Sequence, residues 1–213
     1  MGGSFLRTRV KFWIGLIIAS LFVITIIISY ENYKKFEKAK YVYNRNCYYR
    51  IESTVIKTEQ MINELQKICK SSNVSKESIL RLRYLESSIG SEVTYLNLEV
   101  DDYQWKINKI NGFSYSSGMS GMVIEAYFNY IEKNYNNESY IDLKKEADSL
   151  KYILQYYEGI RKVIYNDSND TNFEKKFKTD IIEKDSWIEI VSRLNKFETD
   201  FNYKNRNKIL VNS

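Results

Sequence analysis

Residues 12–30 form a run without a single charged side chain, bracketed by Lys11 and Glu31. A helix of this length covers about 28 Å, close to the ~30 Å hydrocarbon thickness of a bilayer. Phe12 opens the run, and Trp13 and Tyr30 lie near its two ends, where ring side chains favour the membrane interface. The pattern predicts a transmembrane helix over residues 12–30.

A cleaved signal peptide is the alternative for this segment. The apolar core of such a peptide is usually about 7–15 residues long, and small residues at the cleavage site follow it. Here the apolar run is longer, and it ends in Ile-Ile-Ile-Ser-Tyr-Glu-Asn-Tyr over residues 26–33, which offers no such site. We therefore expect an uncleaved anchor.

Beyond the anchor, core-forming positions recur at intervals of three and four residues, a spacing typical of helices that pack along their length. The first stripe consists of Tyr41, Asn44, Tyr48, Ile51, Val55, Thr58, Ile62, Leu65 and Cys69. The second consists of Ile79, Leu82, Glu86, Ile89, Val93, Leu96, Val100, Tyr103, Ile107 and Ile110. No helix breaker separates the first stripe from the anchor, so we expect one long helix through both. The short connection between the stripes predicts an antiparallel hairpin.

The second helix has a start signal. Ser75 stands where an N-cap belongs, with Val74 and Ile79 at the positions of a hydrophobic staple. A glycine- and serine-rich loop over residues 112–121 follows this helix, and a short helix is expected from about Gly121 to Asn134.

Two further stripes complete the pattern. One consists of Tyr140, Leu143, Ala147, Leu150, Leu154, Tyr157, Arg161 and Ile164, and it is expected to begin at a cap formed by Ser139 and Asp142. The last consists of Phe177, Ile181, Lys184, Ile188, Val191, Leu194, Phe197 and Phe201, which we interpret as one helix behind a capping box at residues 171–174.

The fold class predicted from these stripes is all-α. A single N-terminal transmembrane helix precedes an elongated antiparallel helical bundle with coiled-coil-like packing. The expected divisions are a short tail at 1–11, the anchor at 12–30, the bundle at 31–203 and a frayed tail at 204–213. A parallel oligomer through the first stripe is a second arrangement that the polar members of that stripe leave open.

Composition supports this picture. Proline is absent and glycine is sparse, which suits long helices. Abundant Asn, Lys, Ile and Tyr suggest an AT-rich bacterial genome.

Three of the 32 basic residues and none of the 27 acidic residues precede the anchor. The positive net charge is therefore mainly a signal of membrane topology and does not indicate binding to nucleic acid. We expect the N-terminus in the cytoplasm and the bundle outside the cell membrane, although basic residues also follow the anchor.

Cys47 and Cys69 are the only cysteines. On one straight helix they would lie about 33 Å apart, whereas a disulfide allows only ~4.4–6.8 Å between Cα atoms. We expect no intramolecular bridge. An intermolecular disulfide and two small core residues are the remaining interpretations.

No motif predicts catalysis. The chain has no histidine, which removes the common nucleophile systems and zinc sites. Residues 118–121 lack the spacing of a nucleophile elbow, and residues 167–178 lack the glycine and the last acid of a calcium loop. We therefore predict no catalytic residue, no metal site and no cofactor.

Aromatic residues and methionines flank the glycine-rich loop, and such side chains are typical of recognition surfaces. The predicted binding residues are Phe113, Tyr115, Met119 and Met122, although the same side chains could cap the bundle core.

The leading hypothesis is a non-enzymatic interaction or structural component of a membrane or cell-envelope assembly. Its expected partners are the lipid bilayer and another membrane or envelope protein, or further copies of the chain. The alternative is an extracytoplasmic ligand-binding or sensing module that signals through a separate membrane partner. An enzyme with an unrecognised carboxylate site is the third hypothesis.

Overall fold

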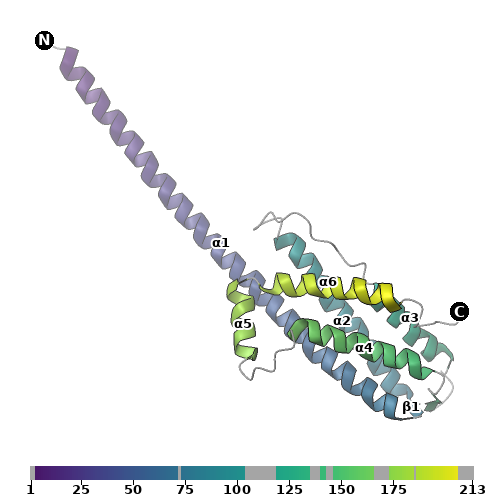
Figure 1. Cartoon of the computed structure of the whole chain (residues 1–213). Coiled ribbons are helices and arrows are strands. Elements are labelled where there is room, and N and C mark those ends of the chain that lie inside the picture. The colour runs from purple at the N-terminus through teal and green to yellow at the C-terminus, as the bar shows by residue number, and fades with distance from the viewer. Residues whose placement is uncertain are drawn as a thin grey trace. The chain divides into compact units, whose positions relative to one another are not determined.

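The structure is a computed structural model that describes residues 3–71, 73–103, 119–134, 140–142, 146–165, 173–184 and 186–205. Within these residues the main elements are six helices: α1 (Gly3–Lys70), α2 (Lys76–Tyr103), α3 (Met119–Asn134), α4 (Ala147–Tyr165), α5 (Phe173–Lys184) and α6 (Ser186–Asn205). Figure 1 shows these helices along the chain. The all-α class predicted from the stripes is confirmed, and so is the continuous helix through the apolar run and the first stripe.

The chain divides into two compact units, Met1–Val42 and Tyr43–Ser213. The first unit contains the apolar run. Among the described residues, α1 is the one helix that is long and apolar enough to cross a membrane, and none of its most apolar stretch is buried within the protein. The second unit contains the bundle.

The carboxylate of Glu92 on α2 holds this helix against α1. Glu92 accepts hydrogen bonds from Arg50 Nη1 at 3.1 Å, Ser53 Oγ at 3.1 Å and Lys57 Nζ at 3.0 Å. Burial raises the pKa of Glu92, but the hydrogen bonds from Lys57, Ser53 and Arg50 and the charge of Lys57 together lower it by more, so the net pKa lies below the usual value. At the far end of the pair, Ser78 Oγ donates to Glu64. Contacts near the start of α2 and in its second half therefore hold the expected antiparallel hairpin.

The predicted start of α2 is confirmed. The backbone N–H of Ser78 donates to Ser75 Oγ at 3.2 Å, and Val74 and Ile79 are both buried. The sequence did not indicate that this cap also belongs to a short strand. Strand β1 (Asn73–Ser75) pairs antiparallel with β2 (Tyr140–Asp142), and Val74 lies opposite Ile141.

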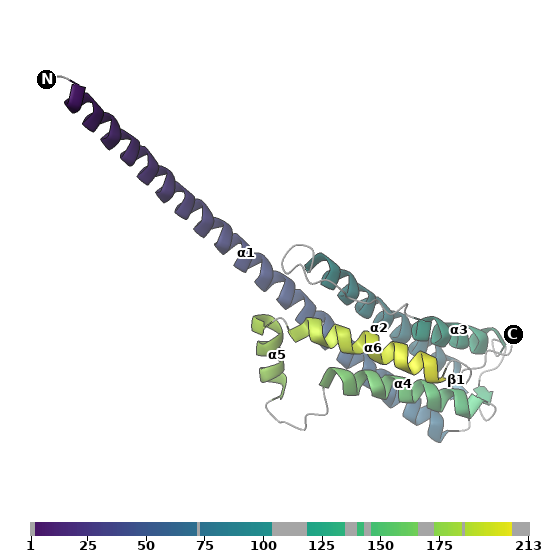
Figure 2. The ribbon, with the colours of Figure 1, turned by 45° about the horizontal axis from the view of Figure 1, so that its top comes forward.

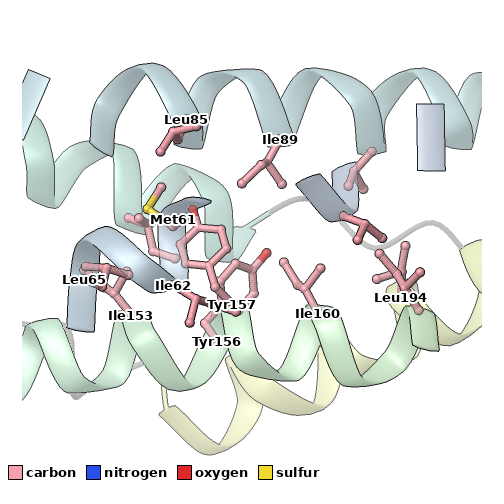
Figure 3. Packing of buried hydrophobic residues seen from close by; sticks show 14 of the residues in the cluster. Met61, Ile62, Leu65, Leu85, Ile89, Ile153, Tyr156, Tyr157, Ile160 and Leu194 are labelled. Atoms are coloured by element: carbon pink, nitrogen blue, oxygen red, sulfur yellow. The ribbon is translucent and has the colours of Figure 1, made fainter. Parts of the chain in front are cut away.

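Helices α4 and α6 lie side by side in both views (Figure 1, Figure 2). Figure 3 shows how buried side chains of α1, α2, α4 and α6 meet: Met61, Ile62 and Leu65 of α1, Leu85 and Ile89 of α2, Ile153, Tyr156, Tyr157 and Ile160 of α4, and Leu194 of α6. Full burial of one such side chain stabilises the fold by about 1.5–3 kcal/mol. Most members of the stripes therefore do form a shared core, but Tyr41 of the first stripe and Arg161 of the third are exposed.

Two sequence expectations on helix boundaries were wrong. Tyr140 belongs to β2 and α4 begins only at Ala147, so no helix starts behind Ser139. The last stripe is divided between two helices, α5 and α6. Lys184, which the pattern placed in the last stripe, is instead exposed, and its Nζ forms an ion pair with Asp180 Oδ1 at 2.8 Å. Ser186 Oγ donates to the carbonyl of Asp180, which stabilises the chain at this break.

Candidate functional site

The structure tests little of the predicted loop site. Phe113 and Tyr115 lie outside the described residues, and of Met119 only its place at the start of α3 is described. Met122 lies on α3 and is 65% exposed. Recognition through these four residues therefore stays a prediction.

A small, partly open cavity with a mainly apolar lining and a few polar groups lies between α2, α3, α4 and α6, and sequence reasoning missed it. Its polar wall consists of Glu86, Asn97, Tyr156, Tyr157 and Glu198. These residues are far apart in the sequence, but each helix turns them toward the bundle interior. The cavity has a volume of about 60 Å³. That is room for a few water molecules or a group of a few heavy atoms, far below the roughly 300 Å³ of a drug-sized ligand site.

Glu86 is the distinctive residue of this cavity. It is only 5% exposed, and within the described part of the chain its carboxylate has neither a hydrogen-bond donor nor an ion-pair partner. Arg83, one turn earlier on α2, forms its ion pair with Glu132 of α3. Burial raises the pKa of Glu86, the charge of Glu125 adds to the shift and the charge of Arg83 opposes it; the net pKa is about 7, against a usual value of 4.5. This carboxyl therefore changes charge near neutral pH.

Two tyrosines and a second carboxylate also line the cavity. Tyr156 donates its hydroxyl hydrogen to Glu198 Oε1 at 3.0 Å, and both residues are buried. Burial raises the pKa of Tyr156 and of Tyr157 well above the usual value, and the nearby charges of Glu198 and Glu86 add to the shift. Both phenols therefore stay neutral and can donate or accept a hydrogen bond.

The remaining wall is apolar and open near the carboxylate. Ile89, Val93 and Ile160 line it, together with Gly90 and Gly121. A Cβ atom on Gly121 would lie 3.5 Å from Glu86 Oε1, and one on Gly90 would lie 3.9 Å away. The two glycines therefore leave the space beside the carboxylate unfilled.

A second feature is an exposed stripe on α2, which we call the outer face. Its residues follow helical spacing and carry no charge: Leu80, Tyr84, Ser87, Ser91, Tyr95 and Leu98. Tyr84 is 70% exposed and Leu98 is 56% exposed. From Leu80 to Leu98 the stripe runs about 27 Å along the helix.

Exposed apolar residues of α1 stand next to the contacts with α2. Tyr49 precedes Arg50, and Ile56 precedes Lys57, two of the residues that bond to Glu92. The Arg50 guanidinium also lies over the ring of Tyr95, 4.3 Å from its centre. Apolar surface is thus exposed on both members of the α1–α2 pair.

The two cysteines differ in environment. Cys47 is fully buried, as the core interpretation expected, and burial together with Glu99 raises its pKa to about 12. Cys69 is exposed, so the core interpretation was wrong for this residue. Cys69 lies in the last turn of α1, where Ile68 is the residue that faces the core. Both cysteines are free thiols, as expected within one chain.

Acidic groups do not gather into a metal site in the described residues, where no cluster of three or more His, Cys, Asp or Glu is present. Comparison of the chain with protein-family models, with curated proteins and with solved structures found no match.

Proposed function

We propose that this chain is a single-pass membrane protein whose bundle is a non-enzymatic interaction component of a cell-envelope assembly. In this proposal residues 12–30 span the membrane, the N-terminus is cytoplasmic and the bundle lies outside. The observation that carries the proposal is the outer face of α2, because an uncharged aromatic stripe on a solvent-facing helix is typical of a protein contact.

The expected partner is an amphipathic helix of another protein in the same membrane. Three features of the outer face support a helical partner. Its positions recur at intervals of three and four residues, its length suits several helical turns, and Ser87 and Ser91 at its centre allow close approach between bulky Tyr84 and Tyr95. Anchoring supports a partner in the same membrane, since confinement to one surface raises the effective concentration of the two proteins.

Site-specific photo-crosslinking in intact cells tests the proposal. A photoreactive amino acid at Tyr84 or Tyr95 should give one discrete heterologous product, and the same probe at exposed Gln155 of α4 should not. Ser91→Glu, which places a charge at the centre of the outer face, should remove the product. Ser192→Glu is the matched control, because Ser192 is an exposed helical serine on α6.

Two results would contradict this proposal. A product that persists at full yield in Ser91→Glu would show that the outer face does not form the contact. A product with the mass of two copies of this chain would identify a self-association surface, and the proposed heterologous partner would be wrong. Protease added to spheroplasts tests the topology separately, because a bundle outside the cytoplasm should be digested without lysis.

A second candidate function is the ligand-binding or sensing module. The cavity at Glu86 favours it, since small-molecule sites are mostly apolar clefts with a few polar groups, and they occur between the helices of bundles.

A further inference from the structure

We infer that the cavity between α2, α3, α4 and α6 is a binding site for a small organic cation, a primary ammonium group on a short apolar body. This inference is independent of the outer face and of any partner that binds there. It rests on the geometry of Glu86, on the mixed lining of the cavity and on its size.

The first step is the unpartnered carboxylate. Glu86 is buried and borders the cavity, yet within the described residues it accepts no hydrogen bond and forms no ion pair. Leaving a buried charged group unpaired is costly, and natural proteins pair such groups or hold them neutral. A cation in the cavity would supply the missing partner.

The second step is the chemistry of the other residues that line the cavity. Tyr156 and Tyr157 present aromatic rings and neutral hydroxyls, and Glu198 adds a second carboxylate. Aromatic rings together with carboxylates are the groups that bind alkylammonium ions. Ile89, Val93 and Ile160 suit the carbon atoms of such a ligand and would offer no oxygen to a metal ion. The lining therefore favours an organic ammonium over an alkali or alkaline-earth ion.

The third step is size. About 60 Å³ accommodates a few heavy atoms. Methylammonium and ethylammonium fit this space, and tetraethylammonium does not. The volume thus defines a ligand class that can be tested with simple probes.

Ethylammonium binding to the full chain in a non-ionic detergent is the direct test, measured by calorimetry at pH 8. We expect saturable binding of ethylammonium, with none for ethanol, tetraethylammonium or potassium. Glu86→Gln keeps the shape of the side chain but removes its charge, and it should weaken binding at least about ten-fold. Glu77→Gln makes the same change at an exposed acid on the same helix and should bind like the unmodified chain.

The dependence on pH provides a second measurement that needs no variant. The ionisable groups near Glu86 are Arg83 on its own helix, Glu125 on α3, Tyr156 and Tyr157 on α4, and Glu198 on α6. A pKa of about 7 at Glu86 means that protons compete with the ligand below neutral pH. Binding should therefore be about ten-fold weaker at pH 6 than at pH 8.

Several outcomes would overturn the inference. The unmodified chain could show no saturable binding of ethylammonium or methylammonium. Binding could be unchanged in Glu86→Gln, which would place the ligand elsewhere. Potassium or tetraethylammonium could bind as well as ethylammonium, which would remove the ammonium specificity. None of these results would affect crosslinking at Tyr84 or Tyr95, so this inference and the proposed protein contact fail separately.

Discussion

The indole N–H of Trp187 donates a hydrogen bond of 2.8 Å to the side-chain oxygen of Asn44, across 143 positions of sequence. Both residues are fully buried. The amide nitrogen of Asn44 donates in turn to the carbonyl of Ile182, also at 2.8 Å. One side chain of α1 therefore binds the end of α5 and the start of α6, at the place where the last stripe is divided between two helices.

Replacing Asn44 by leucine should destabilise the bundle by about 2–4 kcal/mol, because the indole N–H of Trp187 and the carbonyl of Ile182 each lose the hydrogen bond to Asn44. Chemical denaturation monitored by circular dichroism measures this loss. Trp187→Phe in the Asn44→Leu background should restore part of the stability, since it removes one of the two groups that lost a hydrogen bond. Equal stabilities of Asn44→Leu and the unmodified chain would show that the hydrogen bonds contribute nothing.

Gly159 on α4 should resist substitution, although alanine normally stabilises a helix by about 1 kcal/mol over glycine. A Cβ atom at Gly159 would lie 2.2 Å from Cζ of Phe197. The Phe197 ring has little room to move, because it stacks on Tyr156 with ring centres 5.8 Å apart. We expect Gly159→Ala to lower the free energy of unfolding by about 1–3 kcal/mol.

The control for this substitution is Gly90→Ala on α2, where a Cβ atom would meet only Glu86 Oε1 at 3.9 Å. That variant should be neutral or slightly more stable. Phe197→Leu in the Gly159→Ala background should recover stability if the clash is the cause. Identical thermal midpoints for the two glycine variants would contradict the packing argument.

Local signals in the sequence predicted the features that depend on neighbouring residues. The three-and-four spacing located most of the buried positions, and Ser75 with Val74 and Ile79 located the start of α2. The division of the last predicted helix into α5 and α6 was missed because Lys184 was counted as a member of its buried stripe. Its cause is non-local, since the groups that hold α5 and α6 here include Asn44 on α1. The pairing of Val74 with Ile141 is also non-local, and strands of three residues show no alternation to detect.

The candidate cavity could not be predicted because its walls come from four helices. Glu86, Tyr157 and Glu198 are separated by long stretches of sequence, and no motif joins them. One signal was present, since Glu86 occupies a core position of an otherwise apolar stripe. An acid at such a position must be paired, neutral or functional, and its identity alone does not show which.

Glu86 should make the stability of the bundle depend on pH. Its pKa is about 7 in the folded chain and 4.5 in the unfolded chain. Between these values the unfolded chain loses the proton while the folded chain keeps it. The protonated form of Glu86 therefore makes its full contribution to the free energy of unfolding below pH 4.5. That contribution, up to about 3 kcal/mol, is lost as the pH rises to about 7.

Glu86→Gln should remove this part of the pH dependence. Denaturation curves of the full chain in non-ionic detergent should show similar stabilities at pH 4.5 and a more stable variant at pH 8. Glu77→Gln should follow the unmodified chain throughout. A Glu86→Gln variant that loses stability in parallel with the unmodified chain would show that Glu86 is not the titrating group.

The two thiols should react at very different rates. Cys47 is buried with a pKa near 12, whereas Cys69 is exposed. Because the thiolate is the reactive form, iodoacetamide at pH 8 should modify Cys69 more than about a hundred-fold faster than Cys47. Mass spectrometry of the native chain measures this ratio, and unfolding should equalise the two rates. Rapid labelling of Cys47 in the native chain would show that this thiol is not buried.

Leu96 and Leu98 lie two positions apart on α2 and should respond oppositely to the same change. Leu96 is fully buried among the core residues, and Leu98 belongs to the exposed outer face. Leu96→Asp places an unpaired charge in the core, so it should unfold the bundle, with loss of cooperative melting. Leu98→Asp should change the free energy of unfolding by no more than about 0.5 kcal/mol, as is usual for exposed positions.

The same pair separates folding from binding. Leu98→Asp keeps the fold but places a charge at one end of the outer face, so the crosslink from Tyr95 should be weakened while the melting curve is preserved. Leu96→Asp should lose both together. If Leu98→Asp crosslinks as well as the unmodified chain, the contact does not extend to that end of α2. If Leu98→Asp also fails to fold, Leu98 is a core residue, and the outer face was assigned to the wrong side of the helix.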